Sequence, residues 1–178
     1  MRADDLCSVP SRPKCGTFAL IVALDIYQSS SIPRLSGCVN DGEDFYNYLT
    51  SGVLAVPHQN VLVLFNESAT RDNILAAFTS HLIHNDRIAQ DDLIIVFYAG
   101  HGDSVEAPGW NTDGRRVETI CPYDITAFEQ MDHSLGNTKS ASAKYGIPDR
   151  TINALMRQLA KKKGDNIVRS SEHWSGLF

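Results

Sequence analysis

Residues 93–103 read LIIVFYAGHGD, a run of apolar and aromatic residues that leads into a histidine between two glycines. Such a run, rich in branched side chains, is typical of a strand that is buried on both faces of a parallel sheet. Gly100 and Gly102 let the backbone turn sharply and leave the imidazole of His101 accessible. Reactive groups of open parallel sheets gather beyond the carboxyl ends of the strands, so we expect His101 there, exposed beyond its strand.

Two further apolar runs, FALIVAL at Phe18 to Leu24 and VLVLF at Val61 to Phe65, predict two more buried strands. Amphipathic helices are predicted at Asn40 to Thr50, at Ser68 to His84, and from Pro148 and Asp149 to the stop at Gly164. Strands that alternate with helices indicate one α/β domain with a mostly parallel sheet, in which the three strands are contiguous.

The remaining segments are less regular. Gly102 to Gly146 is predicted to be a long loop-rich insertion with one short strand at Val117 to Cys121. After Gly164, Ile167 and Val168 start like a fourth buried strand, but five polar residues follow. A central strand would bury them at a cost of several kcal/mol, so we predict no ordered central strand over Arg169 to Phe178. The expected division is a flexible tail at 1–16, a domain at 17–168 and a divergent tail at 169–178.

Charge and composition limit the partners. A net charge of −5 gives no attraction to phosphate backbones, so we expect no nucleic-acid partner. No apolar stretch has the length of a signal peptide or a membrane span, so we expect a cytoplasmic protein with reduced cysteines and no membrane contact.

Several short motifs, in the right order on the predicted elements, resemble the caspase and metacaspase superfamily. They are FALIVALDIY at 18–27, LSGCVND at 35–41, YAGHGD at 98–103, Asp113-Gly114, Glu118 and TICPYD at 119–124. The resemblance covers Phe18 to about Ile167, and the GCxND form is similar to metacaspases and their fungal-type relatives. It implies a caspase-like three-layer α/β/α fold, here truncated after the third helix, and a cysteine endopeptidase that cleaves peptide or protein substrates after Arg or Lys.

The same resemblance implies roles for individual residues. His101 matches the general base and acid of a Cys/His dyad, and Gly102 the donor of an oxyanion-hole amide. Asp41 matches the acid that lines the pocket for a basic side chain; from its position, it could equally be the N-cap of its helix. No cofactor is expected. Asp103, Asp113 and Asp124 lie where metacaspases resemble calcium binders, but their spacing fits no EF-hand loop.

The nucleophile is where the sequence departs from the family. The family places it after the fourth strand, in a segment such as Asp-Cys-Cys-His-Ser-Gly, whereas residues 165–176 read DNIVRSSEHWSG and only Ser175-Gly176 echoes that motif. No cysteine follows Cys121, which we interpret as a packed structural thiol. Cys38 begins a helix whose dipole would lower its pKa, yet a buried thiol is the favoured interpretation. We therefore expect this chain alone to be inactive.

The sequence is compatible with other interpretations. A non-catalytic interaction module would pair its open sheet edge with another chain, an intact caspase-like homologue. His81 and His84 lack a third metal ligand and are interpreted as surface or helix-end histidines. Ser175 lacks the elbow motif of serine hydrolases. A nucleotide-binding domain is disfavoured because neither G-x-G-x-x-G nor a P-loop follows the first strand.

Overall fold

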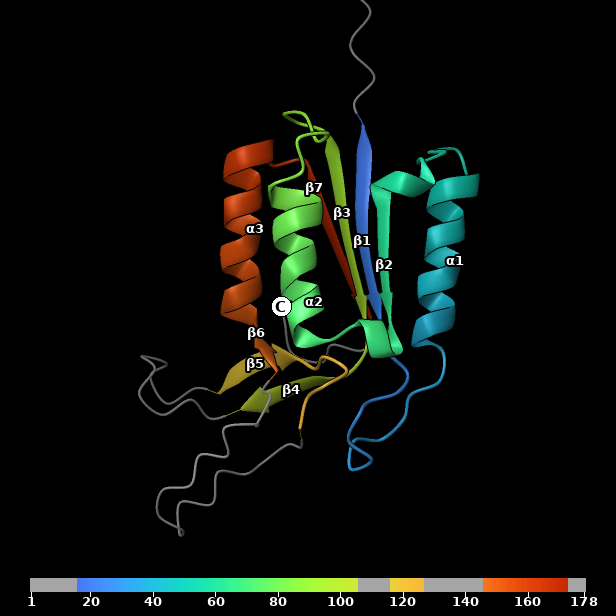
Figure 1. The fold of residues 1–178 in the computed structure, drawn as a ribbon, viewed down its shortest axis with the longest axis vertical. Helices are drawn as coiled ribbons and strands as arrows, with labels where there is room; N and C mark the ends of the chain where they lie inside the picture. The colour runs from blue at the N-terminus through green and yellow to red at the C-terminus, as the bar shows by residue number, and fades with distance from the viewer. Residues whose placement is uncertain (1–15, 106–115, 127–145, 173–178) are drawn as a thin grey trace, which may run out of the picture.

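The computed structural model describes residues 16–105, 116–126 and 146–172. Its main sheet has the strand order β2-β1-β3-β7, and every neighbouring pair is parallel (Figure 1). The strands are β1 (Thr17–Ala23), β2 (Val61–Phe65), β3 (Leu93–Ala99) and β7 (Ile167–Glu172). The three strands predicted from apolar runs are confirmed to within one residue, and they are contiguous.

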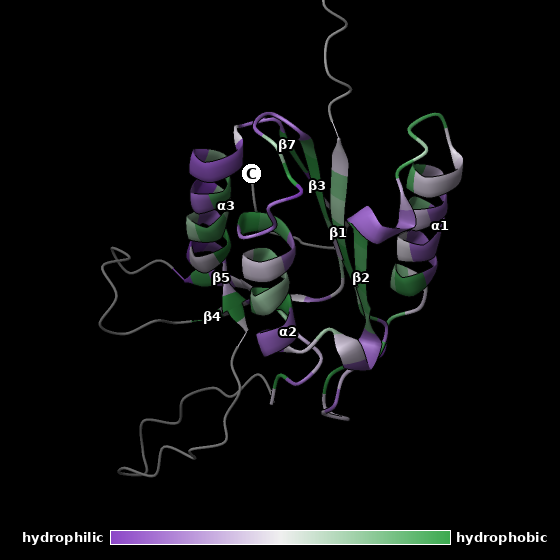
Figure 2. Ribbon diagram, turned by 45° about the horizontal axis from the view of Figure 1, so that its top comes forward, coloured by the Kyte–Doolittle hydropathy of each residue, from purple (hydrophilic) through white to green (hydrophobic). Residues whose placement is uncertain are grey.

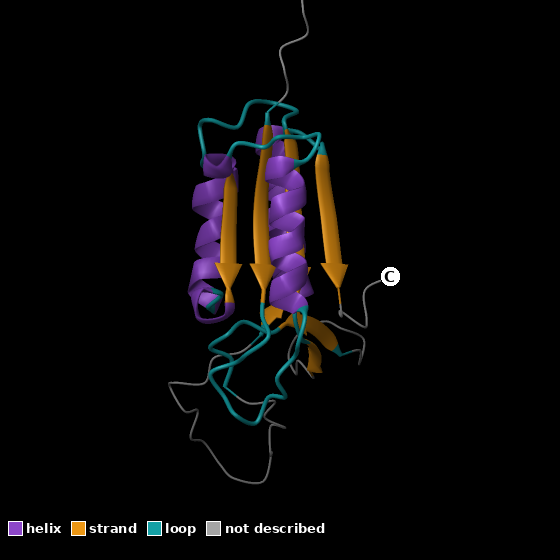
Figure 3. Ribbon diagram, turned by 90° about the vertical axis from the view of Figure 1, so that its right-hand side faces the viewer, coloured by secondary structure: helices purple, strands orange, loops and turns teal. Residues whose placement is uncertain are grey.

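Helices cover both faces of this sheet, which gives the α/β/α architecture that the sequence predicts. Helix α1 (Cys38–Ser51) packs on one face, and α2 (Arg71–Ala76), its continuation η3 (Ala77–Ile83) and α3 (Asp149–Lys163) pack on the other (Figure 1). Strands β2 and β3 are apolar along most of their length, while the helices carry hydrophilic turns (Figure 2). Because the strands are parallel, their arrows point to one edge of the sheet, the carboxyl edge (Figure 3).

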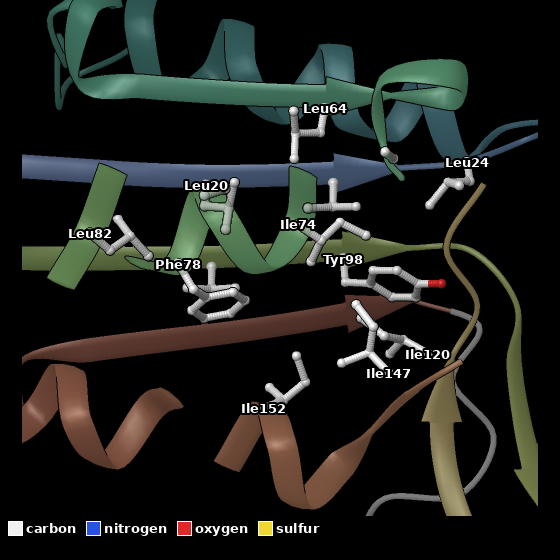
Figure 4. Close-up of a cluster of buried hydrophobic side chains, with 14 of the residues drawn as sticks. Leu20, Leu24, Leu64, Ile74, Phe78, Leu82, Tyr98, Ile120, Ile147 and Ile152 are labelled. Carbon is white, nitrogen blue, oxygen red and sulfur yellow. The ribbon is translucent and has the colours of Figure 1, made fainter. Parts of the chain in front are cut away.

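Side chains alternate between two cores because successive residues of a strand point to opposite faces. Leu20, Val22 and Tyr98 belong to the larger core under α2 and α3 (Figure 4), whereas Ile21 and Phe97 belong to the core under α1. Both cores are needed because a strand in the middle of a parallel sheet has no face toward solvent.

The helix boundaries differ from the predicted ones in two places. Helix α1 begins at Cys38, two residues early. The helix predicted over Ser68 to His84 begins at Arg71, because the Thr70 hydroxyl caps it by accepting the Asn73 N–H at 3.3 Å, and it widens into π-type turns from Ala77. Helix α3 agrees with the prediction and ends at Gly164. Within the described ranges, no helix is both long enough and apolar enough to span a membrane.

A small antiparallel sheet lies beyond the carboxyl edge and was predicted only in part. It consists of β4 (Gly102–Val105), β5 (Val117–Ile120) and β6 (Ile147–Pro148). The strand prediction at Val117 to Cys121 is confirmed. Strands β4 and β6 were predicted as loop, because four and two residues are too few to show an alternating pattern.

The polar run after Val168 is the main correction to the predicted fold. We predicted no ordered central strand over Arg169 to Phe178, but Arg169 to Glu172 belong to an ordered strand, β7, paired residue by residue with β3. These polar residues can form a strand because of where β7 lies in the sheet. In the described part of the chain β7 is the edge of the sheet, and Val168 is 50% exposed. Polar side chains on an edge strand stay hydrated, so the desolvation cost that we invoked does not arise. Residues 173–178 lie outside the described part.

Candidate active site

His101 follows β3 at the carboxyl edge, as predicted, in neither a helix nor the core, but it is half-buried and not fully exposed. Its Nε2 atom lies 2.9 Å from the carbonyl oxygen of Pro33, in the Ser/Pro-rich loop after β1. A carbonyl oxygen only accepts hydrogen bonds, so Nε2 carries the proton of the neutral ring. The lone pair is then on Nδ1, and this atom is available to take a proton from a nucleophile.

The backbone of His101 is also held on both sides. Its N–H donates to the Tyr27 hydroxyl at 2.8 Å, and its carbonyl oxygen accepts from the Tyr98 hydroxyl at 2.7 Å and from the Cys121 N–H at 3.0 Å. The sequence reasoning missed Pro33, Tyr27 and Tyr98 as parts of the site. The only available signal was the position of each tyrosine, shortly after or at the end of a predicted strand.

Gly102 lies next to His101 as the first residue of β4, opposite Ile120 in β5. The structure therefore brings Gly102 and His101 together at the carboxyl edge through the turn between β3 and β4. Gly100, on the other side of His101, is buried against two tyrosine hydroxyls.

Asp41 lies in the first turn of α1, at the same edge of the sheet, and is half-buried. It is not the N-cap of its helix. The carboxylate of Asp25, just past β1, accepts the N–H groups of Cys38 and Val39 at 2.9 and 3.3 Å. The N-cap interpretation of Asp41 is thus wrong, because the capping carboxylate comes from a strand end 13 residues before Cys38. Capping therefore does not occupy the Asp41 side chain.

The two described thiols are packed, as expected. Burial, followed by the charges of Asp25 and Asp41, raises the pKa of Cys38 to about 11. Burial, followed by Asp103, raises the pKa of Cys121 to about 12. At neutral pH both remain thiols, and a thiol is a poor nucleophile. Cys7, Cys15 and Ser175 lie outside the described residues.

The acidic residues near the site have separate partners. Asp103 accepts the N–H of Ser104 at 2.7 Å, and the buried Asp124 accepts the N–H of Arg71 at 2.8 Å at the start of α2. Asp113 lies outside the described residues. Across the described ranges no three His, Cys, Asp or Glu side chains gather in a group that could hold a metal ion.

His81 lies in the last turn of η3, as the helix-end interpretation predicts, but it is not a surface residue. Its side chain is half-buried, and Nε2 lies 3.0 Å from the carbonyl oxygen of Ala19 in β1. Burial lowers the pKa of this imidazole. His81 therefore joins the π-type turns of η3 to the sheet, far along β1 from its carboxyl end.

Comparisons with known proteins can be set beside this geometry. The sequence model of a family described as metacaspase, peptidase C14 domain, matches residues 18–164. No curated protein sequence matches the chain. Among solved structures, the chain is similar to protein GSU0716 from Geobacter sulfurreducens, with a TM-score of 0.62 and 18% identity over 89% of this chain and 50% of that one. The chain thus spans half the length of that structure, and the likeness concerns the fold.

Proposed function

The chain belongs to the metacaspase family, with a peptidase C14 domain, and we propose that it is the histidine-bearing half of a cysteine endopeptidase that cleaves after Arg or Lys. The observation that carries the proposal is the hydrogen bond between His101 Nε2 and the Pro33 carbonyl. It orients the ring so that Nδ1 accepts the proton of a thiol. The thiolate attacks the peptide carbonyl, and the imidazolium then donates this proton to the leaving amine.

Gly102 and Asp41 supply the two remaining roles of the proposed mechanism, which are oxyanion stabilisation and recognition of the basic side chain. The amide of Gly102, next to the imidazole, stabilises the oxyanion that forms when the peptide carbonyl is attacked. The half-buried Asp41 carboxylate at the start of α1 pairs with the basic side chain of the substrate. An Arg or Lys in such a pocket gains a charge-assisted contact that a neutral side chain lacks.

We propose that this chain does not supply the nucleophile, and that a thiol would belong at the end of β7. The resemblance to the family places the thiol after the fourth strand, and β7 is the fourth strand of this sheet. Its last residue, Glu172, is paired with Ala99, two residues before His101. Ser170, Ser171 and Glu172, which end the strand, include no cysteine. We therefore propose that the unaltered chain does not hydrolyse peptides alone.

Installing a thiol at the end of β7 tests the proposal. The variants are Ser171→Cys and Glu172→Cys, each with Cys7 and Cys15 replaced by serine, and the control is Val168→Cys, opposite Ile95 in the middle of β3. The rate of alkylation by iodoacetamide at pH 6–7 is compared with and without His101→Ala. We expect one end position to react about tenfold faster with His101 present, because the imidazole holds the thiol proton. No His101 dependence at either position would overturn the assignment of His101.

A second measurement uses the unaltered chain and peptides containing Arg or Lys. We expect no cleavage, and no effect of His101→Ala. Peptidase activity that depends on His101 would show that one of the existing cysteines or Ser175 is the nucleophile.

The sheet edge favours a second candidate, a non-catalytic module that pairs with an intact caspase-like homologue. Within the described residues β7 pairs with β3 alone, and Val168 on it is half exposed. An open edge of this kind binds a further strand through backbone hydrogen bonds. Co-elution with a complete metacaspase tests this, and Val168→Lys should abolish it. Unchanged co-elution of that variant would exclude the β7 edge as the interface.

A further inference from the structure

We propose that Tyr27 and Tyr98 form a clamp that positions His101, and that this clamp is the reason for the glycine before the histidine. The inference rests on the proposed role of His101 as a proton acceptor and concerns how its ring is held. The two tyrosines come from separate elements: Tyr27 from the loop after β1, and Tyr98 from β3 itself.

The two tyrosine hydroxyls form hydrogen bonds with both peptide groups of His101. The Tyr27 hydroxyl accepts the His101 N–H at 2.8 Å, and the Tyr98 hydroxyl donates to the His101 carbonyl at 2.7 Å. The Tyr98 hydroxyl also lies 3.2 Å from the carbonyl oxygen of Cys121, so its one proton is shared between these two carbonyl oxygens. The two hydroxyls therefore hold both the N–H group and the carbonyl oxygen of His101.

Burial makes the clamp rigid. Tyr27 is 9% exposed and Tyr98 is 6% exposed. Burial raises the pKa of both phenols above their ordinary value, so both keep their protons. Figure 4 shows the Tyr98 hydroxyl at the carboxyl end of the larger core, beyond Ile120 and Ile147. A buried hydroxyl left without a partner is costly, so neither tyrosine is free to leave.

Gly100 leaves the space that the clamp occupies. A Cβ atom at this position would lie 2.8 Å from the Tyr98 hydroxyl and 3.1 Å from the Tyr27 hydroxyl. The backbone at Gly100 does not have the positive φ that favours glycine, so it is the close approach of the two phenols that excludes a side chain.

The clamp acts on the imidazole through the backbone and through direct packing. The Tyr27 ring lies against the His101 ring, with centroids 5.3 Å apart and planes tilted by 38°. With its backbone and one ring face held, the imidazole keeps Nε2 on the Pro33 carbonyl. Tyr27 and Tyr98 are thus positioning residues, and the property they control is which ring nitrogen of His101 carries the proton.

Nitrogen NMR of the histidine rings measures this property directly in the unaltered chain and in Tyr27→Phe and Tyr98→Phe. Each variant keeps its ring and loses only the hydroxyl. We expect the ratio of the Nε2–H to the Nδ1–H tautomer of His101 to fall about fivefold, the effect of one ordinary hydrogen bond. Gly100→Ala, which keeps both hydroxyls but displaces them, should change the ratio in the same direction.

Tyr46→Phe is the matched control, because Tyr46 contacts a different histidine. Its hydroxyl lies 2.6 Å from Nδ1 of His58, with ring centroids 5.7 Å apart. This variant should alter the signals of His58 and leave those of His101 unchanged, whereas the clamp variants should do the reverse. A change in global stability alone would affect both histidines together.

The outcomes separate this inference from the proposed function. An unchanged His101 tautomer ratio in Tyr27→Phe and Tyr98→Phe would overturn the clamp, whatever the installed thiol does. A changed ratio without any His101 effect on the installed thiol would leave the clamp standing and remove the catalytic role.

Discussion

Replacement of Asp25 tests how the strand end at β1 organises the start of α1. Both carboxylate oxygens of Asp25 accept N–H groups of the first turn, from Cys38 and Val39. Loss of an N-terminal cap costs about 0.5–2 kcal/mol, and a carboxylate near the positive end of a helix dipole contributes about 0.3–1 kcal/mol. Asp25 is half-buried and supplies both effects, so we expect Asp25→Ala to lower the free energy of unfolding by about 2 kcal/mol.

Asp41→Ala is the control, since Asp41 shares the dipole but accepts neither of these N–H groups; we expect it to cost about 0.5 kcal/mol. Asp25→Asn keeps one acceptor oxygen and should lie between the two. Urea unfolding with linear extrapolation measures all three variants, provided that the slope stays constant. If Asp41→Ala proved as destabilising as Asp25→Ala, the reasoning that removes Asp41 from the cap would be refuted.

Three further outcomes are expected. Because burial lowers the folded-state pKa of His81, the unfolded chain takes up the proton first. The contribution of His81 to stability should be fully present above about pH 6.5 and fall as the pH drops below it. His81→Leu should flatten this part of the urea-derived profile, and an equally steep profile would contradict the prediction. The raised pKa values should lower the thiolate fraction of Cys38 about 100-fold and that of Cys121 about 1000-fold. Mass spectrometry should therefore find both cysteines alkylated at pH 7.4 only after unfolding. Leu82→Ala, at a side chain without exposed surface, should cost about 2–5 kcal/mol in thermal or urea unfolding, against less than about 0.5 for the fully exposed Val53→Ala.

The prediction from sequence succeeded for β1, β2, β3 and α3, because their patterns are local. A run such as LIIVFYA excludes water from both faces, and the stripe of α3 repeats every three to four residues. The place of His101 followed from the same reasoning, since a residue after a buried parallel strand must emerge at the carboxyl edge. The resemblance to metacaspases rests on short motifs in a fixed order, which are also visible without a structure.

Other features depended on residues far apart in the chain. The Asp25 carboxylate caps α1, and the Pro33 carbonyl accepts the hydrogen bond of the His101 ring. The Tyr27 hydroxyl, which accepts the His101 N–H, comes from 74 residues before the histidine. The run after Val168 is polar enough to forbid a central strand. It is compatible with β7 because β7 is the edge of the sheet in the part of the chain that the structure describes. The hydrophobic pattern of a segment indicates which of its side chains are buried. Hydrogen-bond partners and edge positions depend instead on which segments lie side by side, and the packing of the whole sheet decides this arrangement.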